Sequence, residues 1–143
     1  MAFTAAIGTL VQLEDTPGAG TYSTVAQVGG ITGPSMKGDK IDTTTHDAAN
    51  QGYKTFITGL KEGGTVKFPV FHDPTLTSHA RLVANFNAGQ PENWRVKPPF
   101  ASSFGWSFAG VVLDLGNKYE LNGAAMMDIT IEVSGASTLG VLA

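Results

Sequence analysis

Residues 28–70 read VGGITGPSMKGDKIDTTTHDAANQGYKTFITGLKEGGTVKFPV and determine how the rest of the chain is arranged. Both ends have strand composition, and between them lies a long polar excursion, which in a small domain is usually functional or disordered. The excursion also carries more apolar side chains than a solvated linker holds. These side chains are Ile41, Tyr53, Phe56, Ile57 and Leu60. We therefore expect a long hairpin-like loop over about residues 38–60 that packs on another copy of the chain.

The composition points to one domain with a covered surface. The chain has 143 residues, of which 42% are hydrophobic and only 15% are charged, against a usual charged share of about 25%. A surface with so little charge suits a subunit that neighbouring subunits cover. We expect a single domain over residues 1–143.

Charge and cysteine content exclude several classes of function. The net charge is −3 and the basic residues are scattered, which argues against tight nucleic-acid binding because phosphates require clustered Lys and Arg. The chain has no cysteine, so it has no disulfide framework. No basic leader and no membrane-length apolar run occur, and we expect synthesis and assembly in a cytoplasm, without a membrane.

Alternating apolar residues predict a mainly β fold. The expected strands are residues 7–14, 22–28, 65–71, 93–97 and 127–133, with a hairpin turn across residues 15–20. Pro69 has no backbone N–H to donate, which predicts that its strand lies at a sheet edge or pairs on only one side at this residue. From Phe104 to Leu115 the apolar positions change from even to odd, and Gly110 is the expected site of a β-bulge.

One helix is expected over about residues 74–88. Asp73 as N-cap and Pro74 at the first helical position predict its start, and Gly89 predicts its end. The helix should cover one face of the sheet through an apolar stripe. The stripe consists of Leu76, Ala80, Val83 and Phe86.

Chemistry-bearing residues are present but have simpler interpretations. The pairs His46-Asp47 and His72-Asp73 consist of residue types that bind metal ions. However, His46-Asp47 lies in a polar loop, and Asp73 can cap a helix. Four acidic residues lie on polar strand faces, where contact with solvent is enough to explain an acidic side chain. They are Glu14, Asp114, Asp128 and Glu132. Trp94 or Trp106 could serve a monomeric β-sandwich that binds glycan or peptide. We expect no catalytic, cofactor or metal site, and hence no enzyme.

Residues 31–68 resemble the major tail tube proteins of long-tailed bacteriophages, the siphophage group. That family has Gly-Pro, Asp-x-Thr-Thr-His-Asp, an aromatic residue, Phe-Ile-x-Gly-Leu-Lys-[Asp/Glu]-Gly-Gly and Val-x-Phe in this order. The matching positions are Gly33, Pro34, Asp42, Thr43, Thr44, His46, Asp47, Tyr53, Phe56, Ile57, Gly59, Leu60, Lys61, Glu62, Gly63, Gly64, Val66 and Phe68. The match is close over the middle third of the chain and looser downstream.

The resemblance implies a tail-tube-type β-sandwich or half-barrel with one flanking helix. Six copies would form a ring with a continuous inner barrel, and stacked rings would conduct DNA out of the virion tail without binding it. Implied partners are the tape measure protein, the tail terminator and the baseplate or tip proteins. Some relatives carry an added C-terminal immunoglobulin-like domain, which we do not expect here. A type VI secretion tube protein of the same fold is the alternative, as is the monomeric binding module.

Two candidate sites follow from the resemblance. The inter-subunit or inter-ring loop comprises Asp42, Thr43, Thr44, His46, Asp47, Tyr53, Phe56 and Ile57. A duct for DNA needs a wall without lysine clusters. The expected lumen-facing residues are Asp128, Thr130 and Glu132, with Lys67 if it faces inward.

Overall fold

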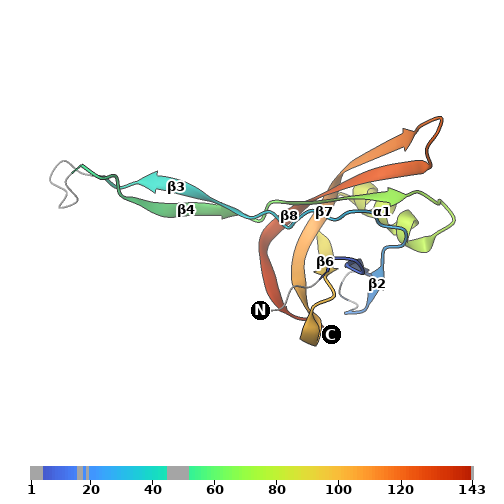
Figure 1. Cartoon of the computed structure of the whole chain (residues 1–143), viewed down its shortest axis with the longest axis horizontal. Coiled ribbons are helices and arrows are strands. Elements are labelled where there is room, and N and C mark those ends of the chain that lie inside the picture. The colour runs from blue at the N-terminus through green and yellow to red at the C-terminus, as the bar shows by residue number, and fades with distance from the viewer. Residues whose placement is uncertain (1–4, 16–17, 19, 45–51, 143) are drawn as a thin grey trace.

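The computed structural model describes residues 5–15, 18, 20–44 and 52–142. These residues form one six-stranded antiparallel sheet, a separate two-stranded hairpin and one α-helix (Figure 1). The sheet order is β2–β1–β6–β7–β8–β5. The bounds are β1 Leu10–Glu14, β2 Tyr22–Thr24, β3 Lys37–Asp42, β4 Phe56–Glu62, β5 Thr65–Phe71, α1 Thr77–Ala88, β6 Glu92–Lys97, η1 Ala101–Ser103, β7 Phe104–Tyr119 and β8 Ala125–Val141. The predicted mainly β fold with one helix is confirmed.

Strand alternation fixes which side of the sheet is buried. In β5, Val66, Phe68 and Val70 are buried, while Lys67 between them is exposed. In the paired strand β8 the buried residues are Met127, Ile129, Ile131 and Val133. Each fully buried apolar side chain of this size contributes about 1.5–3 kcal/mol. The sheet therefore has one face in the core and one face outside it.

The edge position of β5 is confirmed. It is the outermost strand of the sheet and pairs fully only with β8. On its other side the described residues form isolated bridges, Val28↔Val70 and Thr32↔Lys67. Pro69 is therefore tolerated because only one side of the strand needs a continuous ladder.

The last strand is longer than the alternation predicted. β8 continues to Val141, and its final residues pair with the start of β7 through Phe104↔Val141 and Trp106↔Leu139. Leu142 is buried beyond its end. The first two strands are shorter than expected, at Leu10–Glu14 and Tyr22–Thr24, although they form the predicted hairpin.

The change of buried face in β7 does not occur at Gly110, so that prediction was wrong. The register shifts between Ser107 and Ala109 and again between Val112 and Asp114. Gly110 stays on the buried face between Phe108 and Val112, and Leu113 beyond it is exposed, at 52%. A Cβ at Gly110 would lie 2.8 Å from Ile131 Cγ2. The glycine thus serves close strand packing and not a bulge.

The helix begins later than predicted and buries a different face. Asp73 does not cap it; its Oδ1 accepts hydrogen bonds from the backbone N (3.0 Å) and the hydroxyl (2.7 Å) of Thr75 in a turn before α1. Gly89, at φ 67°, ends the helix as expected. The expected stripe was wrong because Ala80 and Phe86 are exposed. The buried face consists of His79, Leu82 and Asn85.

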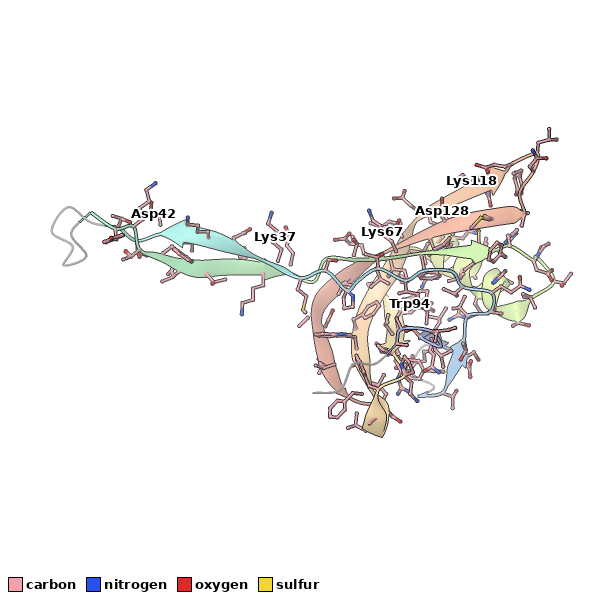
Figure 2. All side chains as sticks on the ribbon, in the orientation of Figure 1. Lys37, Asp42, Lys67, Trp94, Lys118 and Asp128 are labelled. Carbon is pink, nitrogen blue, oxygen red and sulfur yellow. The ribbon has the colours of Figure 1, made fainter. Side chains whose placement is uncertain are left out.

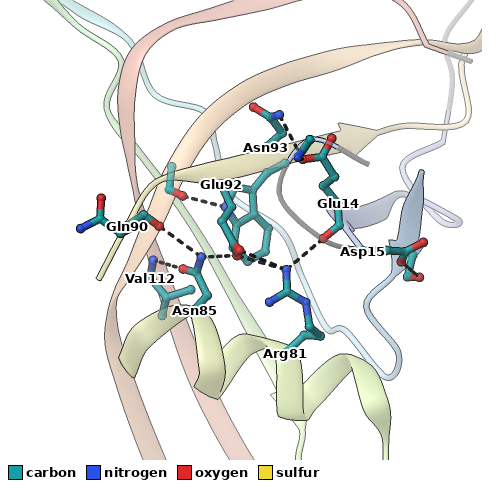
Figure 3. Close-up of polar contacts among 12 residues, drawn as sticks. Glu14, Asp15, Arg81, Asn85, Gln90, Glu92, Asn93 and Val112 are labelled. Atoms are coloured by element: carbon teal, nitrogen blue, oxygen red, sulfur yellow. Dashed lines mark hydrogen bonds and ion pairs between the residues drawn. The ribbon is translucent and has the colours of Figure 1, made fainter. Parts of the chain in front are cut away.

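Polar contacts hold α1 against the sheet (Figure 3). Arg81 donates to the backbone oxygen of Glu14 at 3.0 Å and forms an ion pair with Glu92 at 3.2 Å. Asn85 donates to the Glu92 carboxylate, and its Oδ1 accepts from the backbone N of Val112 at 2.8 Å. These partners offset the cost of burying the Asn85 amide.

Glu14 is buried in this network, contrary to the expectation that it is solvated. Its carboxylate accepts hydrogen bonds from the backbone N–H groups of Gly18 (2.8 Å) and Gly20 (3.1 Å) and from the Asn93 amide (3.3 Å). The Gly18 N–H in particular holds the pKa of Glu14 below its ordinary value, against the opposite effect of burial.

Replacing Glu14 with Gln should make the free energy of unfolding depend less steeply on pH in the acidic range. Because the pKa of the folded-state carboxyl is lowered, its contribution is complete above the ordinary carboxyl pKa and is lost as pH falls through the lowered value. Urea titrations of the wild type and Glu14→Gln at successive pH values would measure this. An unchanged slope of unfolding free energy with pH would contradict the role of Glu14.

Candidate assembly surfaces

A two-stranded arm projects from the body of the protein (Figure 1). We define the arm as β3, β4 and the described residues between them. The strands pair antiparallel, with Lys37 opposite Glu62 and Ile41 opposite Ile57. An isolated two-stranded hairpin is marginally stable in water. The arm therefore needs a further surface to pack on.

The apolar side chains of the arm are not covered within one copy. The exposed fractions are Ile41 47%, Tyr53 78%, Phe56 60%, Ile57 56% and Leu60 82%. None of them belongs to the buried core cluster. Lys40 Nζ lies 5.0 Å from the centre of the Phe56 ring, which leaves most of that ring open. Clustered exposed apolar residues of this kind mark an interaction surface.

The polar residues predicted for the loop close the far end of the arm. Thr43 and Thr55 contact each other through their hydroxyl oxygens at 3.1 Å, and Thr44 Oγ1 accepts from Thr55 N at 2.9 Å. The Thr44 hydroxyl and backbone N–H hold the pKa of Asp42 below its ordinary value. Predicted loop residues His46 and Asp47 lie outside the described residues.

The arm is fixed to the body at its root by close backbone contacts. A Cβ at Gly64, where φ is +79°, would lie 1.6 Å from Ser35 O, and a Cβ at Gly63 would lie 2.4 Å from Gly135 O. Val133 N also donates to Gly64 O at 2.9 Å. Only glycine fits these close approaches, so the Gly-Gly pair that joins β4 to β5 lets the root of the arm lie against β8.

The sheet has two strand edges without partners. β6 pairs with β7 only as far as Gly110, and β5 pairs with β8 only as far as Glu132. Within the described ranges, no strand pairs with the outer edges of residues 113–119 of β7 and 134–141 of β8. Such edges are templates for pairing with another chain. Sequence reasoning missed them because they depend on the relative lengths of neighbouring strands.

The four predicted lumen residues share the outer face of the sheet. Lys67 is paired with Thr130, and Asp128 and Glu132 alternate with buried residues of β8. Lys67, Asp128 and Glu132 are exposed and Thr130 is half-buried; Figure 2 shows Lys67 and Asp128 on the same side of the sheet. Asp114 joins this face opposite Thr130. Simple alternation along β7 does not predict that Asp114 lies on this face, because the register shifts between Val112 and Asp114.

Most of the residues considered for binding or catalysis pack or form hydrogen bonds within the fold. Trp94 is fully buried and donates to Gly110 O at 2.9 Å, and Trp106 packs half-buried against the core. Trp94, one of the two tryptophans considered for the binding-module alternative, therefore cannot stack on a ligand. His72 stacks on buried His79 with ring centres 5.8 Å apart. In the part of the chain that the structure describes, no three His, Asp or Glu residues are grouped to hold a metal.

The fold is that of solved tube and tail proteins. The chain is 18% identical to a chain in the tail of an empty gene transfer agent particle, with a TM-score of 0.77, covering 94% of this chain and 95% of that one. The chain is 13% identical to a chain of the tube-terminating cap of the anti-feeding prophage, with a TM-score of 0.74, covering 99% of this chain and 93% of that one. It is 9% identical to a chain of the SPP1 tail tube, with a TM-score of 0.63, covering 94% of this chain and 76% of that one.

The family is shown by sequence. Residues 10–140 match the model of the lambda phage tail tube protein, and the chain belongs to that family. Its role is therefore structural, in the tail tube of a phage-like particle. The match favours the phage tube over the secretion-tube alternative. A comparison with curated proteins finds no match. Across the described residues, no helix is long and apolar enough to span a membrane.

Proposed function

We propose that six copies of this chain close into a ring and that the rings stack into the tail tube. The gene transfer agent tail of the same fold has C6 symmetry. Free strand edges on β7 and β8 support ring closure because pairing between copies would remove both edges. A head-to-tail contact of this kind builds closed rings or open filaments.

The exposed arm is the observation that carries the proposal. It places Tyr53, Phe56 and Ile57 outside the core of their own copy. In a stacked tube these side chains would be buried against an adjacent ring or subunit, together with Asp42, Thr43 and Thr44. Predicted loop residues His46 and Asp47 belong to the same proposed contact.

The outer face of the sheet would line the bore. Asp114, Asp128 and Glu132 against Lys67 and Lys118 give this face a net charge of −1 per copy (three acids, two lysines). A wall of this sign repels phosphates, so DNA could pass without being held. Thr130 would add a neutral polar group to the same wall.

The remaining partners follow from the position of a tube in a tail. One end of the tube would meet a terminator and the other a baseplate or tip, with a tape measure protein inside during assembly. Solved neighbours include a tube-terminating cap and a baseplate of the anti-feeding prophage. We propose a non-catalytic chain with a single domain over residues 1–143 that assembles in the host cytoplasm.

Light scattering and negative-stain microscopy of the purified protein test this function. We expect rings or tubes with a central hole, in equilibrium with free chains. A monodisperse 14.9 kDa particle at every concentration reached would overturn the proposal.

A further inference from the structure

A hollow of about 600 Å³ lies where the arm joins the body. We call it the socket. Its walls come from the base of the arm and from β8 just beyond the end of its pairing with β5. The lining residues used here are Met36, Lys37, Lys61, Glu62, Gly135 and Ser137. The socket therefore adjoins the free edge of β8.

The socket has a net positive charge and contains polar groups that have no partner within the part of the chain that the structure describes. Lys37 and Lys61 are exposed, and among the described residues neither forms an ion pair. Glu62 leaves a net charge of +1 (two lysines, one acid). Ser137 Oγ is buried without a hydrogen-bond partner in the described structure. Met36, half exposed at 51%, offers an apolar wall. An acidic, partly apolar group would complement this set.

The turn between β7 and β8 has those properties. We call residues 119–123 the tip; it projects from the body away from the arm (Figure 1). Tyr119 and Leu121 are 70% and 100% exposed. Glu120 contacts Lys118 at 3.7 Å, but both side chains are more than half exposed. Exposed pairs of this kind contribute little, so Glu120 is free to change partner.

Strand direction brings tip and socket together. Rotation about a ring axis keeps the direction of each strand relative to that axis, so β7 of one copy would meet β8 of the next antiparallel, as they do within a copy. The two free edges are similar in length, residues 113–119 and 134–141. In antiparallel pairing the end of the first edge at Tyr119 meets the start of the second at Ser134. The tip then lies beside Gly135, in the socket.

We infer that the tip of each copy inserts into the socket of the adjacent copy, with Glu120 beside Lys37 and Lys61. This inference rests on the proposed ring and names its contact. Leu121 would cover Met36 of the neighbour. Because the socket wall is the base of the arm, closing the ring would also brace the arm for stacking.

Charge exchange tests the inference. Glu120→Lys should raise the concentration needed for assembly roughly ten-fold, and Lys37→Glu/Lys61→Glu should do the same. Combining the three substitutions should restore assembly toward the wild-type concentration. Lys118→Glu is the matched control: it changes the β7 residue next to the tip and makes that end of the chain more acidic, so assembly should be unimpaired or stronger. Sedimentation measures the assembled fraction, and circular dichroism confirms folding.

The outcomes separate the two levels of the proposal. Wild-type chains that never form rings would overturn both the ring and the socket. Wild-type rings with an unaffected Glu120→Lys variant, or with no rescue in the combined variant, would overturn the socket and leave the ring standing.

Discussion

Truncating Phe56 to Ala should leave the free chain folded and raise the concentration needed for tube formation by roughly 30- to 1000-fold. Phe56 is 60% exposed on the arm and lies outside the core cluster, so the fold does not depend on it. If it is a central contact between copies, truncation costs about 2–4 kcal/mol of assembly free energy. Pelleting across a concentration series measures the shift.

Phe86→Ala is the matched control for Phe56→Ala. Phe86 is also a partly exposed aromatic residue, at 42%, but it belongs to α1 and not to the arm. Its truncation should not change the assembly concentration. Equal effects of the two variants would show that the arm is not a special contact.

Reversing Asp128 and Glu132 to Lys should trap DNA in the tube. The change removes two negative charges and adds two positive charges per copy on the outer face of the sheet, where both side chains are exposed. A basic wall repeated along the tube would bind phosphates, and we expect release to slow by roughly 1000-fold at low salt. Because counterion release drives such binding, raising the salt concentration should restore release.

Particles carrying the charge-reversed tube would be compared with particles carrying Thr130→Ala. This control changes the same face without adding charge. Fluorescent dye entry into released DNA gives the ejection rate. Unchanged ejection in the reversed variant at low salt would remove these residues from the bore.

Local patterns predicted the elements whose faces follow from their own sequence. Val66, Phe68 and Val70 alternate in a strand whose burial matches the pattern, and the apolar residues of residues 38–60 predicted an unsatisfied arm. The family resemblance in the same stretch is confirmed by the match over residues 10–140. These features depend on short-range sequence alone.

The buried face of α1 depends on distant partners and could not be read locally. His79 is buried because it contacts Ala26 O at 2.7 Å and Asp73 N at 3.1 Å. Asn85 is buried because Val112 donates to it. A helical apolar stripe cannot reveal such contacts, since polar side chains at those positions read as solvent-facing.

The assembly surfaces were only half accessible to sequence reasoning. Asp128, Thr130 and Glu132 share a face by simple alternation, but Asp114 joins them only after the register shift in β7. The free edges and the socket arise from where β5 and β6 stop pairing. Those limits are set by tertiary packing, which no local pattern records.

A helical reconstruction of the assembled protein by electron cryomicroscopy tests the central claim most directly. The account predicts that Tyr53, Phe56 and Ile57 are buried against a different copy and that the arm keeps its extension from the body. An assembled or free chain whose arm is folded over its own sheet, with Phe56 covered by the same copy, would contradict the account.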